Sequence, residues 1–496
     1  MQTLSRKEAS PLSTAAYVVL AVLAALARVL WWRAGIRFDI GPVLGYWQFL
    51  DPTQLASRPF EALLNLHAQP PALNALAAAG LALLGWRAES LFALLFAASG
   101  VAANVASFHV ARAWSGRTSL AAAVFALSLA SPDAILYENL FFTTQPVLCA
   151  LVLSAASLER YLGSRKLRWY ALYGALLLLT LSTRSMYGTA WMAVGLAIPF
   201  AATRPHRREV ATAAALLGAS LLWPLKNGLL FGSWGSSSWM GMNFYNTVYL
   251  QSFSTGELEA SFAGPPLRRV RPPGSTSLVG DIKPFSPPES YVPFLRLRPT
   301  GIPVLDALHK PNGFPNYNWI GYVEVSSEYL RDYVRVVSES PGILVRVFRS
   351  SLGYFVRPAF ESPSFPLLPT SASNLAAARP VLEVVRRTVV LAWPGGTPIS
   401  FRPFSLLALA LLLLCLAGLP VLAATGLRAG DPLAPLALFV LWNVAYVTLV
   451  GNLFESLENM RFRLEIEPLM LIAAAALAGA AWRTPQGAGK KKGPPV

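Results

Sequence analysis

One uninterrupted apolar run of the chain reads Phe404-Ser-Leu-Leu-Ala-Leu-Ala-Leu-Leu-Leu-Leu-Cys-Leu-Ala-Gly-Leu-Pro-Val-Leu-Ala-Ala424. It carries no charged side chain, and a helix needs about 20 apolar residues to cross a bilayer. The whole chain of 496 residues has the same character, with 54% hydrophobic and only 13% charged residues. Ordinary soluble domains carry about 25% charged residues. The composition therefore predicts a membrane protein with several spans and excludes collagen-like, disordered and disulfide-scaffold classes.

Apolar runs of similar length recur along the chain and predict about ten transmembrane helices. They lie at 12–32, 90–111, 118–136, 139–158, 169–183, 186–202, 210–228, 402–424, 432–451 and 468–482. Another run, 68–85, opens with Pro70-Pro71 and is only marginally long, so we expect it to lie at the interface or to re-enter. If it crossed, the sides of everything before it would be reversed. The predicted fold class is an all-α polytopic membrane protein with a large mixed extramembrane loop.

The chain has a net charge of +16, and the positions of its basic residues predict its orientation in the membrane. In a soluble protein this excess would suggest a nucleic-acid partner, but here we expect a lipid bilayer and no nucleic acid. The segments 160–168 and 204–208 and the tail residues 490–492 are strongly basic. Basic loops next to spans stay in the cytoplasm. Counting spans between these segments places 33–89 and 229–401 outside.

This count of spans divides the chain into four parts. We expect an N-terminal transmembrane catalytic module at 1–228, with seven spans and its first external loop at 33–89. A large external loop region follows at 229–401, then C-terminal transmembrane helices at 402–482 and a basic cytoplasmic tail at 483–496.

Two helices are predicted inside the large loop. The first begins at Val325 and ends before Pro341-Gly342, which stops a helix. The second covers 343–356, where apolar residues mix with Arg346 and Arg349, and is expected to lie along the membrane surface.

Acids are scarce, so those at the outer span ends are candidates for chemistry. Asp39 follows the first span directly, and Glu138 occupies a short loop between two closely spaced spans. An acid at the membrane interface is costly unless it has a partner or a purpose. Asp39 has a structural alternative, in which it pairs with Arg33 or Arg37. Glu138 has one too, as part of a solvated turn.

A second group of polar residues precedes the apolar run that begins at residue 68. Asp51, His67 and Gln69 stand close to Pro70-Pro71 on the outer side, together with aromatic residues. The aromatic residues alone are typical of an interfacial belt, and His67 alone is typical of a helix cap or a surface position. The grouping of acid, histidine and amide favours a site.

Three arginines at outer span ends are candidate anion ligands. Arg184 divides an otherwise apolar stretch, and Arg461 and Arg463 precede the last span. Arginine is planar, permanently charged and able to hold phosphate in a bidentate way. For Arg461 and Arg463 an Arg–Glu network among loops is the alternative, whereas Arg184 has no acid near it in sequence.

The order of these features resembles the C-type (GT-C) glycosyltransferases that take a sugar from a polyprenyl phosphate. This superfamily includes protein O-mannosyltransferases and bacterial aminoarabinose and lipopolysaccharide-sugar transferases. Asp39 opens the first external loop, His67-Ala-Gln69-Pro70-Pro71 leads into an apolar helix, and Arg184 and Arg461-Phe-Arg463 lie at later outer span ends. No second acid follows Asp39, and a Gln separates the His from the Pro-Pro. These departures leave the sugar and any use of a divalent metal open.

The resemblance implies an inverting reaction on a polyprenyl-phosphate sugar donor, with a glycan, lipid or protein of the cell envelope as acceptor. Asp39 would be the catalytic base, with Asp51 as the second candidate. His67, Gln69 and Glu138 would position the donor or acceptor. Arg184, Arg461 and Arg463 would hold the phosphate. The large loop would cover the site, and Trp234, Trp239, Asn243 and Tyr245 are side chains of the kinds that contact sugars.

Two other functions remain open from the sequence. An O-antigen ligase or polymerase also carries a large external loop, but it uses a diphosphate-linked glycan. A transporter or flippase would bury charges in mid-span and show duplicated halves, which this sequence lacks. Abundant Ala, Leu and Arg with few Lys favour a GC-rich bacterial genome, and hence an inner membrane protein with a periplasmic site. Two cysteines and four histidines scattered along the chain form no zinc-type cluster.

Overall fold

The computed structural model describes residues 13–251, 282–362, 368–391 and 399–487. Arg6, Lys7 and the basic tail at 490–492 helped to orient the chain, and they lie outside the described residues. The same holds for most of the predicted tail domain, 483–496.

Seven helices in the described part of the chain are long and apolar enough to cross a membrane, or eight if a bent pair counts as one span. They are α1 (Thr14–Arg33), α5 (Ala72–Leu84) continued by α6 (Ala88–Ser115), α9 (Thr144–Ser164), α12 (Arg207–Phe231), α19 (Pro403–Ala429), α20 (Ala434–Leu453) and α21 (Asn459–Gly487). The bent pair is α7 (Thr118–Ala130) and α8 (Pro132–Glu138), which meet at 57°. The predicted fold class, a helical multi-pass membrane protein, is confirmed.

The expected total of about ten spans is not confirmed. Two predicted spans, 169–183 and 186–202, correspond to α10 (Leu167–Thr183) and to α11 (Thr189–Ala197) with a 3-10 turn. Both helices are shorter than the others because Arg184 and Gly188 interrupt the apolar stretch between them. The predicted span 468–482 is longer than expected, since α21 begins at Asn459 and its polar first turns stay helical.

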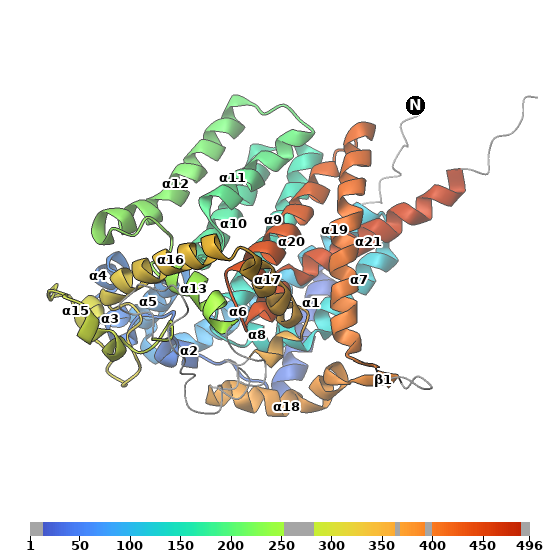
Figure 1. Cartoon of the computed structure of the whole chain (residues 1–496). Coiled ribbons are helices and arrows are strands. Elements are labelled where there is room, and N and C mark those ends of the chain that lie inside the picture. Colours follow the sequence, from blue (N-terminus) through green and yellow to red (C-terminus); the bar gives the residue numbers. More distant parts are fainter. Residues whose placement is uncertain (1–12, 252–281, 363–367, 392–398, 488–496) are drawn as a thin grey trace, which may run out of the picture.

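The run 68–85 forms α5, which is 13 residues long. At 1.5 Å per residue it measures about 20 Å, less than the roughly 30 Å of a hydrocarbon core. Helix α5 packs against α3 (Pro52–Ser57) and α4 (Pro59–Leu64), and a 3-10 turn joins it to α6. Figure 1 shows these short helices, with α2 (Gly41–Gly45), gathered at one end of the long helices. By length, α5 does not cross alone.

The segment 229–401 is mostly helical where it is described. It contains α13 (Met240–Leu250), α15 (Pro303–Asp306), α16 (Gly321–Glu339), α17 (Gly342–Phe355) and α18 (Pro369–Arg386). A short antiparallel ladder, β1 (Val389–Leu391) with β2 (Ile399–Phe401), leads into α19. The two predicted helices are present as α16 and α17. Helix α17 packs against α20 and α21, and its position along the membrane surface stays a prediction.

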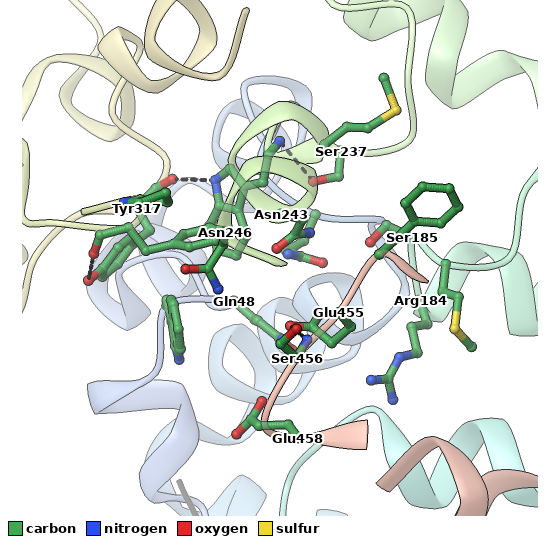
Figure 2. Close-up of a pocket in the computed structure, with 18 of the residues that line it drawn as sticks. Gln48, Arg184, Ser185, Ser237, Asn243, Asn246, Tyr317, Glu455, Ser456 and Glu458 are labelled. Carbon is green, nitrogen blue, oxygen red and sulfur yellow. Dashed lines mark hydrogen bonds between the residues drawn. The ribbon is translucent and has the colours of Figure 1, made fainter. Parts of the chain in front are cut away.

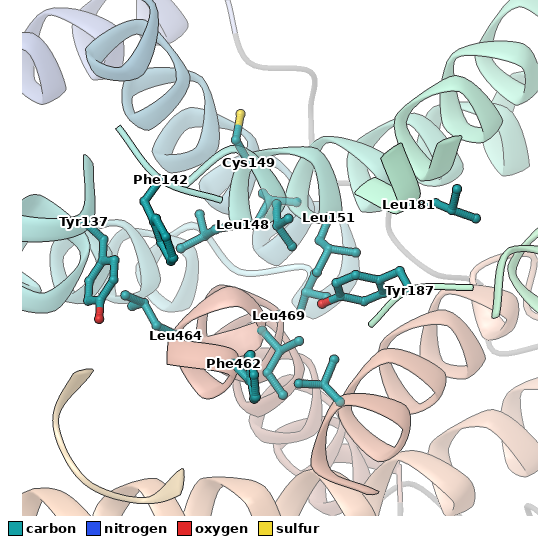
Figure 3. Packing of buried hydrophobic residues seen from close by; sticks show 14 of the residues in the cluster. Tyr137, Phe142, Leu148, Cys149, Leu151, Leu181, Tyr187, Phe462, Leu464 and Leu469 are labelled. Carbon is teal, nitrogen blue, oxygen red and sulfur yellow. The ribbon is translucent and has the colours of Figure 1, made fainter. Parts of the chain in front are cut away.

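Helix α9 forms the centre of the membrane part, since it packs against α6, α10 and α21. Figure 3 shows Leu148 and Leu151 of α9 facing Leu464 and Leu469 of α21. Small residues allow such helices to approach closely. At Gly479 of α21, an added Cβ would lie 2.6 Å from the Ser115 carbonyl oxygen of α6. These contacts fix the position of α21, the helix whose first turn carries Arg461.

Candidate functional site

A cavity of about 820 Å³ lies where several membrane helices end. Arg184 at the end of α10, the end of α20, the beginning of α21 and Thr143 before α9 contribute to its wall. The rest of the wall comes from residues 34–71 between α1 and α5, called here the first extramembrane segment, and from the loop 229–401. This volume lies within the range of about 300–1,000 Å³ that is typical of small-molecule sites. Figure 2 shows the cavity with 18 of its lining residues.

Arg184 enters the cavity wall because helix α10 ends there. Its backbone is extended (φ −141°, ψ 127°), so the chain leaves the helix at this residue. The guanidinium stacks on Phe462 at 4.1 Å and forms an ion pair with Glu465 of α21. The hydroxyl of Tyr187 donates to the other oxygen of Glu465 at 3.0 Å. The acid that Arg184 lacks in its own sequence neighbourhood is thus supplied by α21.

Arg461 lies in the first turn of α21, and only 4% of it is exposed. Its guanidinium forms an ion pair with Glu458 and lies 5.0 Å from the centre of the Phe142 ring. Its Nε and Nη1 atoms are buried and have no hydrogen-bond partner among the described residues. A buried donor without a partner is costly, more so on a charged group. An anion placed against Nε and Nη1 would accept hydrogen bonds from their N–H groups.

Two carboxylates line the cavity, and both come from the connection between α20 and α21. Glu458 accepts a hydrogen bond from the Ser362 hydroxyl at 3.2 Å. Burial raises the pKa of Glu455 to about 7. Between them, Leu457 has a positive φ of 75°, which is rare for a residue with a branched side chain and stores strain of the kind found at functional sites. Sequence reasoning missed Glu455, although it lies at the end of an apolar helix, as Asp39 and Glu138 do.

The other end of the cavity is aromatic. Trp47 of the first extramembrane segment contacts Phe285 at 5.2 Å and Tyr317 at 5.5 Å between ring centres. Trp239 contacts both rings too, and its indole N–H donates to the Tyr317 carbonyl oxygen at 3.1 Å. The amides Gln48, Gln69, Asn243 and Asn246 line the same cavity.

Of the four sugar-contacting types predicted in the large loop, Trp239 and Asn243 line the cavity. Trp234 does not, and it is 70% exposed. Tyr245 does not either, since it is buried and its ring stacks on Tyr329 at 5.0 Å.

Asp39 lies outside the cavity wall and is 3% exposed. Its carboxylate accepts hydrogen bonds from the Gly41 N–H at 2.8 Å and from the N–H and hydroxyl of Ser371 at 2.8 and 2.6 Å. The sequence alternative of a pair with Arg33 or Arg37 is therefore wrong. Ser371 belongs to the first turns of α18, so Asp39 ties this helix to the end of α1.

Asp51 and His67 also lie outside the cavity wall. Asp51 caps α3, because its carboxylate accepts from the N–H and hydroxyl of Thr53 at 3.0 and 2.6 Å. His67 is fully buried, with its ring nitrogens 2.7 Å from the Ser238 hydroxyl and 2.9 Å from the Asn318 carbonyl oxygen. Burial lowers the pKa of His67 to about 3, so the ring is neutral. It joins the first extramembrane segment to the large loop.

Glu138 and Arg463 form buried ion pairs away from the large cavity. Glu138 is held by Arg28 through two contacts of 2.9 and 2.7 Å. Arg463 pairs with Glu467 and, at 3.4 Å, with Asp133. The Arg–Glu network that was the alternative for Arg463 is present. Of the predicted site residues, the structure thus brings Gln69, Arg184 and Arg461 together in the cavity wall.

Metal ligands do not cluster in the described ranges. No group of three or more His, Cys, Asp or Glu side chains that could hold a metal ion occurs there. Both cysteines, Cys149 and Cys415, are buried and unpaired.

Comparison with known proteins gives a likeness in structure alone. No protein-family model matches the chain, and no curated protein matches it. The chain is similar to the crystal structure of ArnT from Cupriavidus metallidurans bound to undecaprenyl phosphate, with 16% identity, 96% of this chain and 81% of that chain covered, and a TM-score of 0.34. The apo structure of the same ArnT gives 18% identity, 93% and 78% coverage and a TM-score of 0.30.

A second similar structure is the archaeal oligosaccharyltransferase AglB from Archaeoglobus fulgidus, in complex with an inhibitory peptide and a dolichol-phosphate. Identity is 12%, the TM-score is 0.38, and the match covers 97% of this chain but only 52% of the AglB chain. Likenesses at these TM-scores do not decide the function, which has to be argued from the cavity.

Proposed function

We propose that the protein is a membrane glycosyltransferase, which moves a sugar from a polyprenyl-phosphate donor to a cell-envelope acceptor on the periplasmic side. One observation carries the proposal: the buried guanidinium of Arg461, a residue in the wall of a cavity of about 820 Å³, has two nitrogen atoms, Nε and Nη1, without a hydrogen-bond partner among the described residues. A phosphate is the anion whose geometry suits a planar guanidinium. The cavity lies at the ends of apolar helices, where a lipid phosphate would be delivered.

Arg461 and Arg184 hold the donor phosphate in this proposal. Their positive charges stabilise the negative charge that develops on the phosphate oxygen as the bond to the sugar breaks. Each arginine already has one carboxylate partner, Glu458 or Glu465. The phosphate therefore binds beside an existing ion pair, and the carboxylates keep the guanidinium groups in position.

The base that activates the acceptor is Glu455 in our proposal. The acceptor hydroxyl gives its proton to the Glu455 carboxylate, its oxygen attacks the anomeric carbon, and the bond from that carbon to the phosphate oxygen breaks. The lipid phosphate leaves with the electron pair, and the configuration at the anomeric carbon inverts. The pKa of Glu455, raised by burial to about 7, suits a base that works near neutral pH.

Asp39, the base that the superfamily resemblance implies, is the second candidate. It lies outside the cavity wall and would reach the acceptor only after Ser371 releases its carboxylate. Gln69 positions the donor or the acceptor from the cavity wall. The proposed contribution of His67, Glu138 and Arg463 is to hold the surrounding segments in place, since each is fully engaged with protein groups.

Lipid extraction from a set of bacterial strains tests the proposal. The strains are wild type, a deletion, and the deletion carrying either Arg461→Gln or the control Arg335→Gln, a change at an exposed ion pair on α16. We expect mass spectrometry to detect an accumulated polyprenyl-monophosphate sugar in the deletion and in Arg461→Gln, but not in Arg335→Gln. The mass would identify the sugar. Accumulation of a polyprenyl-diphosphate glycan instead would contradict the proposal and favour a ligase or polymerase.

A further inference from the structure

The two ends of the cavity differ in chemistry. One end carries the two arginines and the two carboxylates described above, whereas the other carries rings and amides. In Figure 2, Tyr317 and Asn246 appear on one side of the cavity, Arg184 on the opposite side, and Glu455 between them. The proposed donor phosphate occupies the arginine end. The opposite end is left for the second substrate.

The aromatic end presents several ring faces and edges at one place. Trp47, Trp239, Phe285 and Tyr317 form a connected cluster with centre-to-centre distances of 5.2 to 6.5 Å. Rings of this kind offer broad, rigid apolar surface with little loss of conformational entropy. The flat C–H face of a pyranose ring is complementary to such a surface.

Unpartnered amide oxygens stand at the same cavity. Oε1 of Gln48 and Oδ1 of Asn246 are buried, and neither accepts a hydrogen bond from any described residue. A buried acceptor without a donor is costly to the folded protein. Neutral carbonyl oxygens beside an apolar ring surface match the hydroxyl groups of a sugar, each of which can donate one hydrogen bond.

The charges at the aromatic end argue against an amine acceptor. Both carboxylates among the described lining residues, Glu455 and Glu458, belong to the α20–α21 connection. The ionisable side chain that lines the wall next to Phe285 is Lys283, a cation. An ammonium group would meet a like charge there, whereas a neutral hydroxyl would not.

We propose that the aromatic and amide end of the cavity is an acceptor subsite for a carbohydrate ring, so that the acceptor is a glycan. This inference rests on the proposed function. Trp47 and Phe285, the partly exposed rings of the cluster, contact the C–H face of the sugar ring. Gln48 and Asn246 turn their amide groups toward its hydroxyl groups and accept hydrogen bonds from them. The hydroxyl to be glycosylated points toward Glu455. Side chains of the first extramembrane segment and of the large loop thus together determine which acceptor binds.

Saturation-transfer NMR on the purified full chain in lipid nanodiscs tests this proposal. The probes are methyl α- and β-glycosides of mannose, glucose and galactose, and a short peptide that contains Ser and Thr. Undecaprenyl phosphate is added to fill the phosphate end without bringing a sugar. We expect at least one glycoside to give a signal that persists with undecaprenyl phosphate bound, and the peptide to give none.

Three variants make the result specific. Gln48→Leu and Trp47→Leu should each weaken glycoside binding about fivefold, as expected for the loss of one ring or hydrogen-bond contact. Trp234→Leu, a change at an exposed ring outside the cavity, should leave it unchanged. Binding of undecaprenyl phosphate reports on folding. If Trp47→Leu loses it, the conclusion rests on Gln48→Leu, which removes an amide oxygen that has no partner.

Four outcomes would overturn the inference. They are no glycoside signal while undecaprenyl phosphate still binds, a signal that the cavity variants do not change, displacement of the glycoside by undecaprenyl phosphate, and a signal from the peptide alone. Each of these leaves the proposed function standing, because the phosphate end is tested separately. Failure of undecaprenyl phosphate itself to bind would overturn the proposed function and the inference together.

Discussion

Glu455 is the cavity carboxylate whose ionisation state changes near neutral pH. Its pKa, raised by burial to about 7, means that the group is protonated below this pH and ionised above it. A base acts in its ionised form, so we expect kcat to rise with pH through about 7 and then to level off. Glu455→Gln should lower kcat by about 10²- to 10⁴-fold and should remove this rise. The measurement is a pH profile of sugar transfer in detergent or nanodiscs.

Glu458→Gln is the matched control for Glu455, since it changes the neighbouring carboxylate by the same single group. Glu458 pairs with Arg461, and its negative charge helps to raise the pKa of Glu455. Its loss should therefore change the KM for the donor and move the rise of kcat to lower pH, but it should not remove this rise. If Glu455→Gln keeps both its rate and its pH profile, the base lies elsewhere and Asp39 becomes the leading candidate.

Residues of the site differ in how far sequence alone could reveal them. Arg184 and Arg461 were predicted because a permanent charge at the end of an apolar run needs a reason. The carboxylate partner of Arg184 could not be predicted, because Glu465 is 281 positions away in the chain. Asp39 was predicted for the same reason, but its carboxylate accepts hydrogen bonds from the N–H and hydroxyl of Ser371 and lies outside the cavity wall. A pattern of charges marks where ionisable groups lie and leaves open which of them face a cavity.

Helix α18 is held to the end of α1 by Asp39. A hydrogen bond to a charged group contributes about 1.5–3 kcal/mol, so both Asp39→Asn and Ser371→Ala should speed amide hydrogen exchange across Pro369–Arg386 by about tenfold or more. Ser373→Ala is the control, because the Ser373 hydroxyl is exposed and bonds within the same helix. Hydrogen exchange followed by mass spectrometry measures the effect. Loss of transfer in Asp39→Asn without faster exchange in α18 would instead assign Asp39 a chemical role.

Gly100 of α6 leaves room for the ion pair between Arg28 and Glu138. An added Cβ would lie 1.7 Å from Oε2 of Glu138 and 2.5 Å from Nη2 of Arg28. Gly100→Ala should therefore displace the pair and lower the free energy of unfolding by about 3 kcal/mol, as expected when a buried ion pair is broken. Thermal unfolding in detergent, followed by intrinsic fluorescence, measures the change.

Gly163→Ala is the matched control in α9, where an added Cβ would meet no atom within 4 Å. This change should leave stability unchanged or raise it by up to about 1 kcal/mol, because alanine favours a helix more than glycine. Equal stability of the Gly100 and Gly163 variants would show that Arg28 and Glu138 are not paired in the folded protein.

Elements were predictable where one physical rule determined them. Long apolar runs gave α1, α12, α19 and α20 close to their true ends, because the bilayer thickness fixes the length of a span. The same rule predicted two helices at 169–183 and 186–202, and the structure has them as α10 and as α11 with its 3-10 turn, but neither is long enough to count as a candidate span. The sequence did not reveal that α17 packs against α20 and α21. Amphipathicity predicts a buried face and does not say what buries it.

The site exists only in the whole molecule, because its wall comes from segments that are far apart in the chain. The first extramembrane segment supplies Trp47 and Gln48, the turn after α10 supplies Arg184, and the α20–α21 connection supplies Glu455 and Arg461. His67 and Asn318 hold the first of these segments against the large loop. No local pattern encodes such an assembly, so sequence reasoning could name members of the wall but not the wall itself.

Membrane orientation is the prediction that belongs to the whole molecule, since every proposed role needs the cavity on the outer face. The two native cysteines are buried, so single introduced cysteines can be labelled against a low background. Thr300→Cys, in the large loop, should react with a membrane-impermeant maleimide in intact cells whose outer membrane has been opened. Ala202→Cys, exposed between α11 and α12 near the basic segment 204–208, should react only after the inner membrane is permeabilised. The positive-inside rule requires this difference. The reverse pattern would place the cavity in the cytoplasm, where a nucleotide-linked sugar would be the available donor, and would overturn the proposed periplasmic reaction.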